Sequence, residues 1–345
     1  MRRALAVLVP LALALSLRGS LACDAAPIDE PTKSWSFVYE ELPAALLSVW
    51  GSSANDIFFA GSDPKDGGGP WVLHWDGHAM TRLRTGQSGT LWWVSGTTAS
   101  GDVYFSGEAG LALRYVRQTQ QFTKLTGAEA GVTLFGIFPV PGARVWVVGS
   151  DTRNNLGKVY NVDGDALVPA ADLPEGAGDG SPFFKVWGRS ETDLWIVGLG
   201  QAALHRTAGG WVSFPTTAQG RLFTVHGNAD TTVAVGGFIT ASAVALSDSG
   251  VSDITPSGAP QLNGVFVEPS GRVVAVGTGG AVWQRAPAGG AWSEVTVPSS
   301  LLDYHAVYVD PTGDVWAVGG FVLSDPLRQG MLLHFGAPIP TAVPE

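Results

Sequence analysis

The stretches LLSVWGSSANDIFFAG (residues 46–61) and FKVWGRSETDLWIVG (residues 184–198) share one pattern. An apolar stretch ending in an aromatic residue is followed by a polar turn, and then by a second apolar stretch that closes in glycine. The short polar turn between two apolar runs favours a β-hairpin. The pattern therefore predicts a pair of antiparallel strands in each of these segments.

The same pattern occurs seven times along the chain, and its closing glycines set a period. Their separations are 46, 42, 49, 38, 41 and 42 residues, a mean of about 43, which is the span of a four-stranded propeller blade. Third and fourth strands are expected after each pair, as at 71–75 and 210–214. The sequence thus predicts an all-β fold, a seven-bladed β-propeller of four-stranded blades. The closing glycines are Gly61, Gly107, Gly149, Gly198, Gly236, Gly277 and Gly319.

The two ends of the repeat region indicate how the ring closes. The last unit lacks a tryptophan-containing fourth strand after Phe335, whereas WSFVYE (residues 35–40) precedes the first unit and has that character. We expect this segment to complete the last blade, so that no sheet edge stays open. The propeller is then predicted over residues 35–336, with a C-terminal tail at 337–345.

Composition agrees with a folded β-rich domain. The chain of 345 residues has 46 glycines and 22 prolines, which disfavours long helices, and it is 45% hydrophobic and only 14% charged. The formal net charge is −10, and no basic run occurs, so a nucleic-acid partner is not expected. The single cysteine excludes a zinc or iron–sulfur site built on cysteine pairs within the chain.

The first 22 residues are typical of an export signal. Two arginines precede an apolar run from Ala4 to Leu17, which is too short to span a bilayer comfortably, and small residues follow. Removal of this predicted signal peptide would leave a formal charge of about −13. An anionic membrane surface would repel such a chain.

The segment Ser20-Leu21-Ala22-Cys23 resembles the lipobox of bacterial lipoproteins, whose cysteine is acylated and becomes the new N-terminus. The resemblance implies that Cys23 is lipidated and that residues 23–34 are a tether, so that the membrane is contacted through the lipid alone. Ordinary signal-peptidase cleavage, which the same residues allow, would release a periplasmic or secreted protein. Localisation in the cell envelope, at the inner or the outer membrane, is the expectation.

The repeats resemble exported bacterial propellers of the pattern "VWG, turn, DxWAVG, LHWDG, W", loosely related to the photosystem assembly-factor type and to Asp-box (BNR-like) propellers. The resemblance covers residues 35–336 and implies the fold. The Asp-box core of sialidases is not matched, so their active-site residues have no counterparts here. The repeated signatures of WD40 and kelch propellers are also absent.

Several short motifs imitate functional sites without their companions. Residues 198–203 fit G-x-G-x-x-A, yet no acidic residue follows at the ribose-binding distance. Residues 161–172 imitate a calcium loop, but the sixth position is Ala166 instead of glycine. Ser62 and Lys65 match S-x-x-K by letter only. We therefore expect no cofactor, no metal and no catalytic residue at these motifs.

Two sets of polar residues recur at equivalent positions of the repeat, and both are expected to serve structure. The histidines lie on third strands, away from the axis and separated by whole blades, so they cannot share a metal ion. The acids lie at one hairpin position. These residues are His74, His205 and His334, and Asp56, Asp102, Asp193 and Asp314.

An aromatic row on the first strands is expected mainly to pack between blades. Some of its members could also face the central channel, where aromatic rings would offer a platform for a sugar or a peptide. His226 stands in the same row, and Ser95 interrupts it. The candidate channel-facing aromatics are Trp50, Phe138, Trp187, Phe266 and Tyr308.

The resulting functional prediction is a monomeric binding or scaffolding module at the cell envelope whose partner is an envelope protein or a glycan. The alternative is an envelope glycan-binding protein, or a glycan hydrolase or lyase that uses the axial funnel; such enzymes need two suitably spaced carboxylates. Long insertions between strands are the expected contact loops. They are residues 62–70, 172–182 and 324–330.

Overall fold

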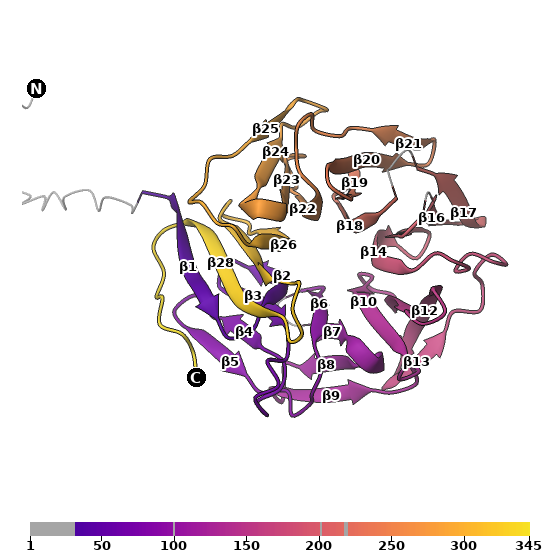
Figure 1. Ribbon diagram of the computed structural model, residues 1–345. Helices are drawn as coiled ribbons and strands as arrows, with labels where there is room; N and C mark the ends of the chain where they lie inside the picture. Colours follow the sequence, from indigo (N-terminus) through magenta and orange to yellow (C-terminus); the bar gives the residue numbers. More distant parts are fainter. Residues whose placement is uncertain (1–31, 99–100, 201, 217–219) are drawn as a thin grey trace, which may run out of the picture. The chain divides into compact units, whose positions relative to one another are not determined.

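The computed structural model describes residues 32–345 except 99–100, 201 and 217–219. Within this part of the chain, seven four-stranded antiparallel sheets are arranged as blades in a ring (Figure 1). The seven-bladed β-propeller is therefore confirmed. Two short 3-10 turns, η1 (Glu108–Gly110) and η2 (Thr278–Gly280), are its helical segments.

Within each blade the strands follow one another from the axis outward, except that the last blade ends in β1. Blade 1 contains β2 (Leu46–Ser53), β3 (Asp56–Gly61), β4 (Val72–Trp75) and β5 (Met80–Leu83); blade 2 contains β6 (Leu91–Gly96), β7 (Val103–Gly107), β8 (Ala112–Val116) and β9 (Gln121–Leu125); blade 3 contains β10 (Val132–Pro139), β11 (Val145–Asp151), β12 (Leu156–Asp163) and β13 (Ala166–Pro169). Blade 4 contains β14 (Phe183–Ser190), β15 (Asp193–Gly198), β16 (Ala202–Thr207) and β17 (Gly210–Pro215); blade 5 contains β18 (Leu222–Gly227), β19 (Thr232–Gly237), β20 (Ala241–Ser247) and β21 (Gly250–Asp253); blade 6 contains β22 (Leu262–Val267), β23 (Val273–Gly277), β24 (Val282–Arg285) and β25 (Trp292–Glu294); blade 7 contains β26 (Asp303–Val309), β27 (Val315–Phe321), β28 (Arg328–Gly336) and β1 (Ser34–Leu42).

The ring closes through the N-terminal strand, as the sequence predicts. The indigo β1 lies beside the yellow β28 in Figure 1, and the two pair antiparallel from Ser34 opposite Gly336 to Leu42 opposite Gly330. Tyr39 on β1 also donates a hydrogen bond from its hydroxyl to the carbonyl of Ala342, 3.1 Å away. The C-terminal tail therefore packs against the strand that closes the ring.

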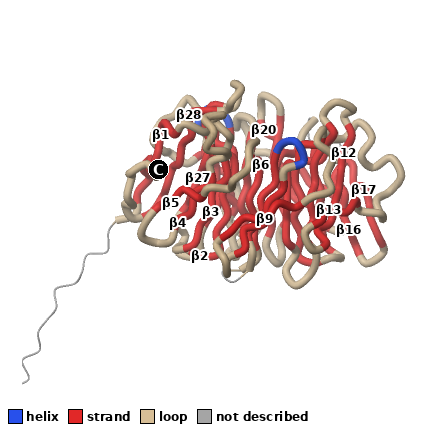
Figure 2. Tube along the Cα trace, turned by 90° about the horizontal axis from the view of Figure 1, so that it is seen from below, coloured by secondary structure: helices blue, strands red, loops and turns tan. Residues whose placement is uncertain are grey.

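Antiparallel order gives the ring two faces, at opposite ends of the strands (Figure 2). We call one the hairpin face; it carries the turns from first to second and from third to fourth strands, such as 54–55 and 310–314. The other, the crossover face, carries the second-to-third loops and the connections between blades. The three long insertions, residues 62–70, 172–182 and 324–330, all belong to connections of the crossover face.

The closing glycines of the repeat have one shared physical cause. Every first strand has a register shift near its crossover end, for example between Phe183 and Lys185 in β14. Beside this shift, a backbone carbonyl at the start of the first strand lies against the closing glycine of the second: a Cβ on Gly198 would lie 2.0 Å from the oxygen of Pro182, which precedes β14. The other six closing glycines meet a first-strand or preceding carbonyl oxygen at 2.0–2.4 Å in the same way. A side chain is therefore excluded at each of these positions.

Hydrophobic clusters lie between neighbouring blades and hold the ring together. The second strands are buried on both faces, as in the VWVVG run of β11, which agrees with sheets covered on each side. The fully buried tryptophans Trp146, Trp195 and Trp316 are the largest side chains of this core. Each comes from the second strand of a different blade.

The predicted signal peptide, Cys23 and most of the predicted tether lie outside the described residues. The compact propeller unit spans Lys33–Glu345. Within the described residues, none of the helical segments has the length and apolar character needed to cross a membrane.

Candidate functional site

Three of the hairpin acids lie beside the repeated histidines, and two of these pairs form hydrogen bonds between second and third strands. His74 Nε2 lies 2.8 Å from Asp56 Oδ1, and the imidazole stacks on Phe58 with 4.2 Å between ring centroids. In blade 4, His205 pairs with Asp193 at 3.0 Å and stacks on Trp195 at 3.9 Å. His334 lies on Trp316 in blade 7, 3.6 Å from Asp314. These residues do not converge on a metal site, and no cluster suited to a metal ion occurs among the described residues.

In the segment 161–172, which resembles a calcium-binding loop in sequence, two residues are paired with arginines. Arg144 Nη1 donates to Asn161, 3.1 Å away, and Arg114 forms an ion pair of 2.5 Å with Asp165. Both contacts use the oxygens that a cation would need. The G-x-G-x-x-A segment leads into a strand, β16, and not into the helix that a dinucleotide site requires.

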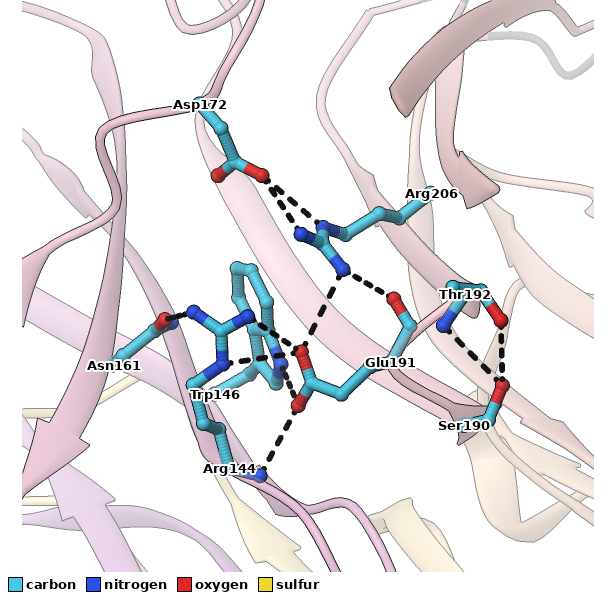
Figure 3. A network of polar contacts seen from close by, with 8 residues as sticks. All are labelled: Arg144, Trp146, Asn161, Asp172, Ser190, Glu191, Thr192 and Arg206. Carbon is cyan, nitrogen blue, oxygen red and sulfur yellow. Dashed lines mark hydrogen bonds and ion pairs between the residues drawn. The ribbon is translucent and has the colours of Figure 1, made fainter. Parts of the chain in front are cut away.

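An ion-pair network joins blades 3 and 4 and includes residues of their first-to-second-strand turns (Figure 3). Glu191, in the β14–β15 turn, accepts hydrogen bonds from Arg144 and from the Trp146 indole nitrogen, which lies 3.1 Å away. Arg206 contacts Glu191 and reaches Asp172 at 2.9 Å. Because all of these charges are paired with one another, the network clamps two blades and leaves no free acid for chemistry.

The aromatic residues of the first strands pack against one another across blade boundaries and surround a shared cavity. All five candidates line one axial cavity together with His226 and Ser95. His226 stacks on Phe266 with 4.3 Å between centroids, and Phe266 meets Tyr308 edge to face at 5.3 Å. The row continues from Phe138 to Trp187 at 6.3 Å and from Trp187 to His226 at 5.7 Å, and Trp50 completes it.

Glycines of the neighbouring blade make room for three of these rings. A Cβ on Gly51 would meet Tyr308 at 2.7 Å, and one on Gly96 would meet Trp50 at 2.5 Å. Gly227 leaves the same space for Trp187. The rings therefore reach across the blade boundary, which fixes their orientation around the axis.

At the hairpin face the channel opens into a pocket of about 560 Å³, which we call the axial pocket. This volume lies within the range of small-molecule sites. The turns of blades 6 and 7 form its wall, and aromatic rings form its floor. Its main lining residues are Trp50, His226, Phe266, Glu268, Tyr308 and Asp310.

Both carboxylates of the axial pocket are already engaged. Glu268 is paired with Arg272 through bonds of 2.7 and 2.8 Å. Asp310 accepts hydrogen bonds from the Thr312 backbone and from the Trp316 indole nitrogen, at 2.8 and 3.2 Å. Neither is free in this arrangement for the acid–base work that a glycan hydrolase needs.

His226 is held as a neutral imidazole. Its Nδ1 accepts a hydrogen bond of 3.0 Å from the Val267 backbone, so the proton sits on Nε2. Burial lowers the pKa of His226 to about 3. Burial likewise raises the pKa of Tyr308, so its hydroxyl stays protonated.

At the crossover ends of the first strands lies a second set of aromatic residues, which we call the crossover row and which the sequence analysis missed. Its members are five of the seven residues skipped by the register shifts, and the ring centroids of four neighbouring pairs lie 5.4–5.8 Å apart. A signal was available, because the position directly after the first apolar residue of each unit is aromatic in most units. These residues are Trp92, Phe135, Phe184, Phe223 and His305.

Lys185 lies beside the crossover row and is almost fully buried, with 5% of its surface exposed. Its Nζ donates to the Phe135 carbonyl at 2.6 Å and lies 4.1 Å from the centroid of a Trp93 ring. No carboxylate of the described residues pairs with it. Burial lowers the pKa of Lys185 to about 7.

Comparisons of sequence found no match among protein-family models and none among curated proteins. Comparisons of structure found propellers. Virginiamycin B lyase from Staphylococcus aureus aligns with TM-score 0.68 and 13% identity over 88% of this chain and 99% of that chain. YCF48 from Cyanidioschyzon merolae gives TM-score 0.64 and 14% identity over 90% and 100% of the two chains. The WD40 propeller domain of Doa1 gives TM-score 0.65 and 14% identity over 87% and 97%.

These neighbours include a lyase and a WD40 domain, and the identities are low. The likeness therefore extends to the propeller fold, which supports many unrelated activities. The comparisons place this chain among seven-bladed β-propellers by its structure.

Proposed function

We propose that the protein is an exported binding or scaffolding module, anchored in the cell envelope through lipidated Cys23, whose crossover face recognises an envelope protein. The observation that supports this recognition surface is that the long loops gather at the crossover face. The insertions 62–70 and 324–330 belong to loops of this face and are joined by an ion pair of 2.5 Å between Lys65 and Asp325, and the insertion 172–182 leads to it from the contact of Asp172 with Arg206.

Exposed apolar side chains mark the same face. Five of the eight large exposed hydrophobic residues among the described residues belong to crossover-face loops or the strand end beside them. Such side chains are typical of protein recognition when they are grouped and surrounded by polar residues. They are Phe238, Ile239, Leu301, Phe321 and Leu323, with exposed fractions of 64, 76, 98, 39 and 84%.

The entry point of the chain is compatible with an anchor behind the recognition surface. Ser34, where β1 begins, pairs with Gly336 at the hairpin end of β28. A tether from Cys23 would thus join the ring at its hairpin face. The crossover face would then be free to point away from the membrane.

Cross-linking on intact cells, followed by affinity purification and mass spectrometry, tests this proposal. We expect a reproducible envelope-protein partner that is lost when Phe238 and Ile239 are both changed to serine. The matched control changes Val168 and Val212 to serine; these valines are 45 and 42% exposed on outer strands, and the partner should be kept. Retention of the partner in the Phe238/Ile239 variant would contradict the assignment of the face.

The anchor is tested separately with Cys23→Ser. We expect this variant to lose incorporation of labelled palmitate and to leave the membrane fraction. Unchanged membrane retention would contradict the anchor while leaving the recognition surface in place.

A further inference from the structure

The axial pocket combines aromatic surface with hydrogen-bond donors that the protein does not use. Among the described residues, Trp50 Nε1, His226 Nε2 and Tyr308 Oη have no hydrogen-bond partner, although their side chains line the pocket. Elsewhere, comparable indole nitrogens are satisfied, since Trp75 Nε1 donates to the Ala54 carbonyl at 3.1 Å. The donors of the pocket are therefore left to solvent or to a ligand.

The charges around the pocket select against an anion. None of its lining residues is a lysine or an arginine, and two carboxylates, Glu268 and Asp310, stand in its wall. Arg272 balances Glu268, whereas no cation among the described residues forms an ion pair with Asp310, so an anionic ligand would meet the charge of Asp310. Nucleotides and phosphorylated ligands are disfavoured by this reasoning.

A cationic ligand fits less well than a neutral one. Both carboxylates are occupied, Glu268 by Arg272 and Asp310 by its own turn and Trp316. The stacked contact between His226 and Phe266 also covers part of the aromatic faces that would attract a cation. In addition, the three free donors would point positive charge toward such a ligand.

We propose that the axial pocket binds a neutral saccharide. Its hydroxyl and ring oxygens accept hydrogen bonds from Trp50, His226 and Tyr308, and the apolar face of a sugar ring lies on the part of the aromatic floor that the stack of His226 on Phe266 leaves open. The proposal stands apart from protein recognition by the crossover face, because it uses the opposite end of the ring and other residues.

The test measures binding of maltose, cellobiose and N,N′-diacetylchitobiose to the full-length protein by ligand-observed NMR titration. We expect at least one of these disaccharides to bind. Tyr308→Phe removes only the free hydroxyl and should weaken binding about three- to tenfold, the usual effect of one hydrogen bond. Trp50→Phe keeps an aromatic ring without the indole donor and should weaken binding by a similar factor.

The matched control is Tyr304→Phe on the same strand, β26. The Tyr304 hydroxyl is also without a partner, but it is fully buried and does not line the axial pocket. This variant should bind the disaccharide like the unaltered protein, and equal melting temperatures of all variants show that the fold is kept.

Three results would overturn the proposal. The first is that none of the three disaccharides binds. The second is that Tyr308→Phe and Trp50→Phe bind as tightly as Tyr304→Phe. The third is that tetramethylammonium or inorganic phosphate displaces the bound disaccharide from the pocket, which would assign the site to an ion.

Discussion

The hairpin and crossover ends of the blades are stabilised in different ways. At the hairpin end, carboxylates are paired with cations or imidazoles, as Asp56 is with Arg117 and His74. At the crossover end, backbone carbonyls press against the closing glycines, and Lys185 is buried without a carboxylate. Paired side-chain charges thus stabilise the hairpin end of several blades, whereas a close backbone contact with the closing glycine recurs at the crossover end of every blade.

This difference explains which end is free to acquire a ligand. The backbone fit at the crossover end recurs in all seven blades and allows little variation at the glycines. The hairpin end varies from blade to blade: where blade 1 has Asp56 opposite His74, blade 6 has Arg272 facing Gln284 at 3.5 Å. An asymmetric pocket forms at the end where the side chains differ.

Replacement of a closing glycine is the strongest way to break the comparison. In Gly198→Ala the new Cβ would lie 2.0 Å from a backbone oxygen, so the strands of blade 4 must move apart. We expect a loss of about 2–3 kcal/mol in the free energy of unfolding, the upper part of the range for an overpacked core. Denaturant titration followed by tryptophan fluorescence measures it.

Gly209→Ala is the control at the hairpin end of the same blade. Its nearest neighbour would be the Thr207 hydroxyl at 3.6 Å, an ordinary contact, and Gly209 does not have a positive φ. We expect a change within about 0.5 kcal/mol. Equal losses in the two variants would show that the two ends do not differ in backbone fit.

The fold could be predicted because its signals are local. Each hairpin turn and closing glycine is legible within about 16 residues, and their period gives the blade count, while 35–40 stands where a missing fourth strand is needed. The crossover row was missed because a one-residue register shift changes which side chains face the axis. Residues such as Phe184 then point where simple alternation does not place them.

Contacts between blades could not be read from the sequence either. Arg117 and Asp56 are 61 residues apart and meet only because blades 1 and 2 are neighbours. The positions of the aromatic row could be chosen from the repeat. The unpaired hydrogen-bond donors of the axial pocket could not be predicted, because a donor stays unpaired only where the adjacent blade places no acceptor beside it.

Replacement of Lys185 tests the crossover end through the pH dependence of the free energy of unfolding. In the unfolded chain a lysine keeps its proton up to about pH 10, whereas burial lowers the pKa in the folded protein to about 7. The folded state therefore binds fewer protons between pH 7 and 10, and stability rises with pH there, by at most about 1.4 kcal/mol per pH unit. Lys185→Met should remove this slope and add about 1–2 kcal/mol at pH 7.

The measurement is the free energy of unfolding from pH 7 to 9.5, with Lys124→Met, an exposed lysine of β9, as the control. The control should keep the slope of the unaltered protein. Parallel curves for all three proteins would mean that Lys185 is not responsible for any pH dependence at the crossover end.

Asp56→Asn tests the hairpin end. We expect this variant to have the smallest effect on stability, and we expect its effect to disappear in acid. Burial raises the pKa of Asp56, but hydrogen bonds from His74, Arg117 and Ser52 outweigh it and hold that pKa well below its usual range. The contribution is thus present above the unfolded value of about 3.9 and is lost as the pH falls below it. We expect Asp56→Asn to cost about 1 kcal/mol at pH 7 and progressively less below pH 4, measured against Asp163→Asn, an exposed acid in another hairpin turn. A cost that is the same at pH 3 and pH 7 would mean that the carboxylate charge does not stabilise this end, and the contrast between the two ends would then rest on the backbone alone.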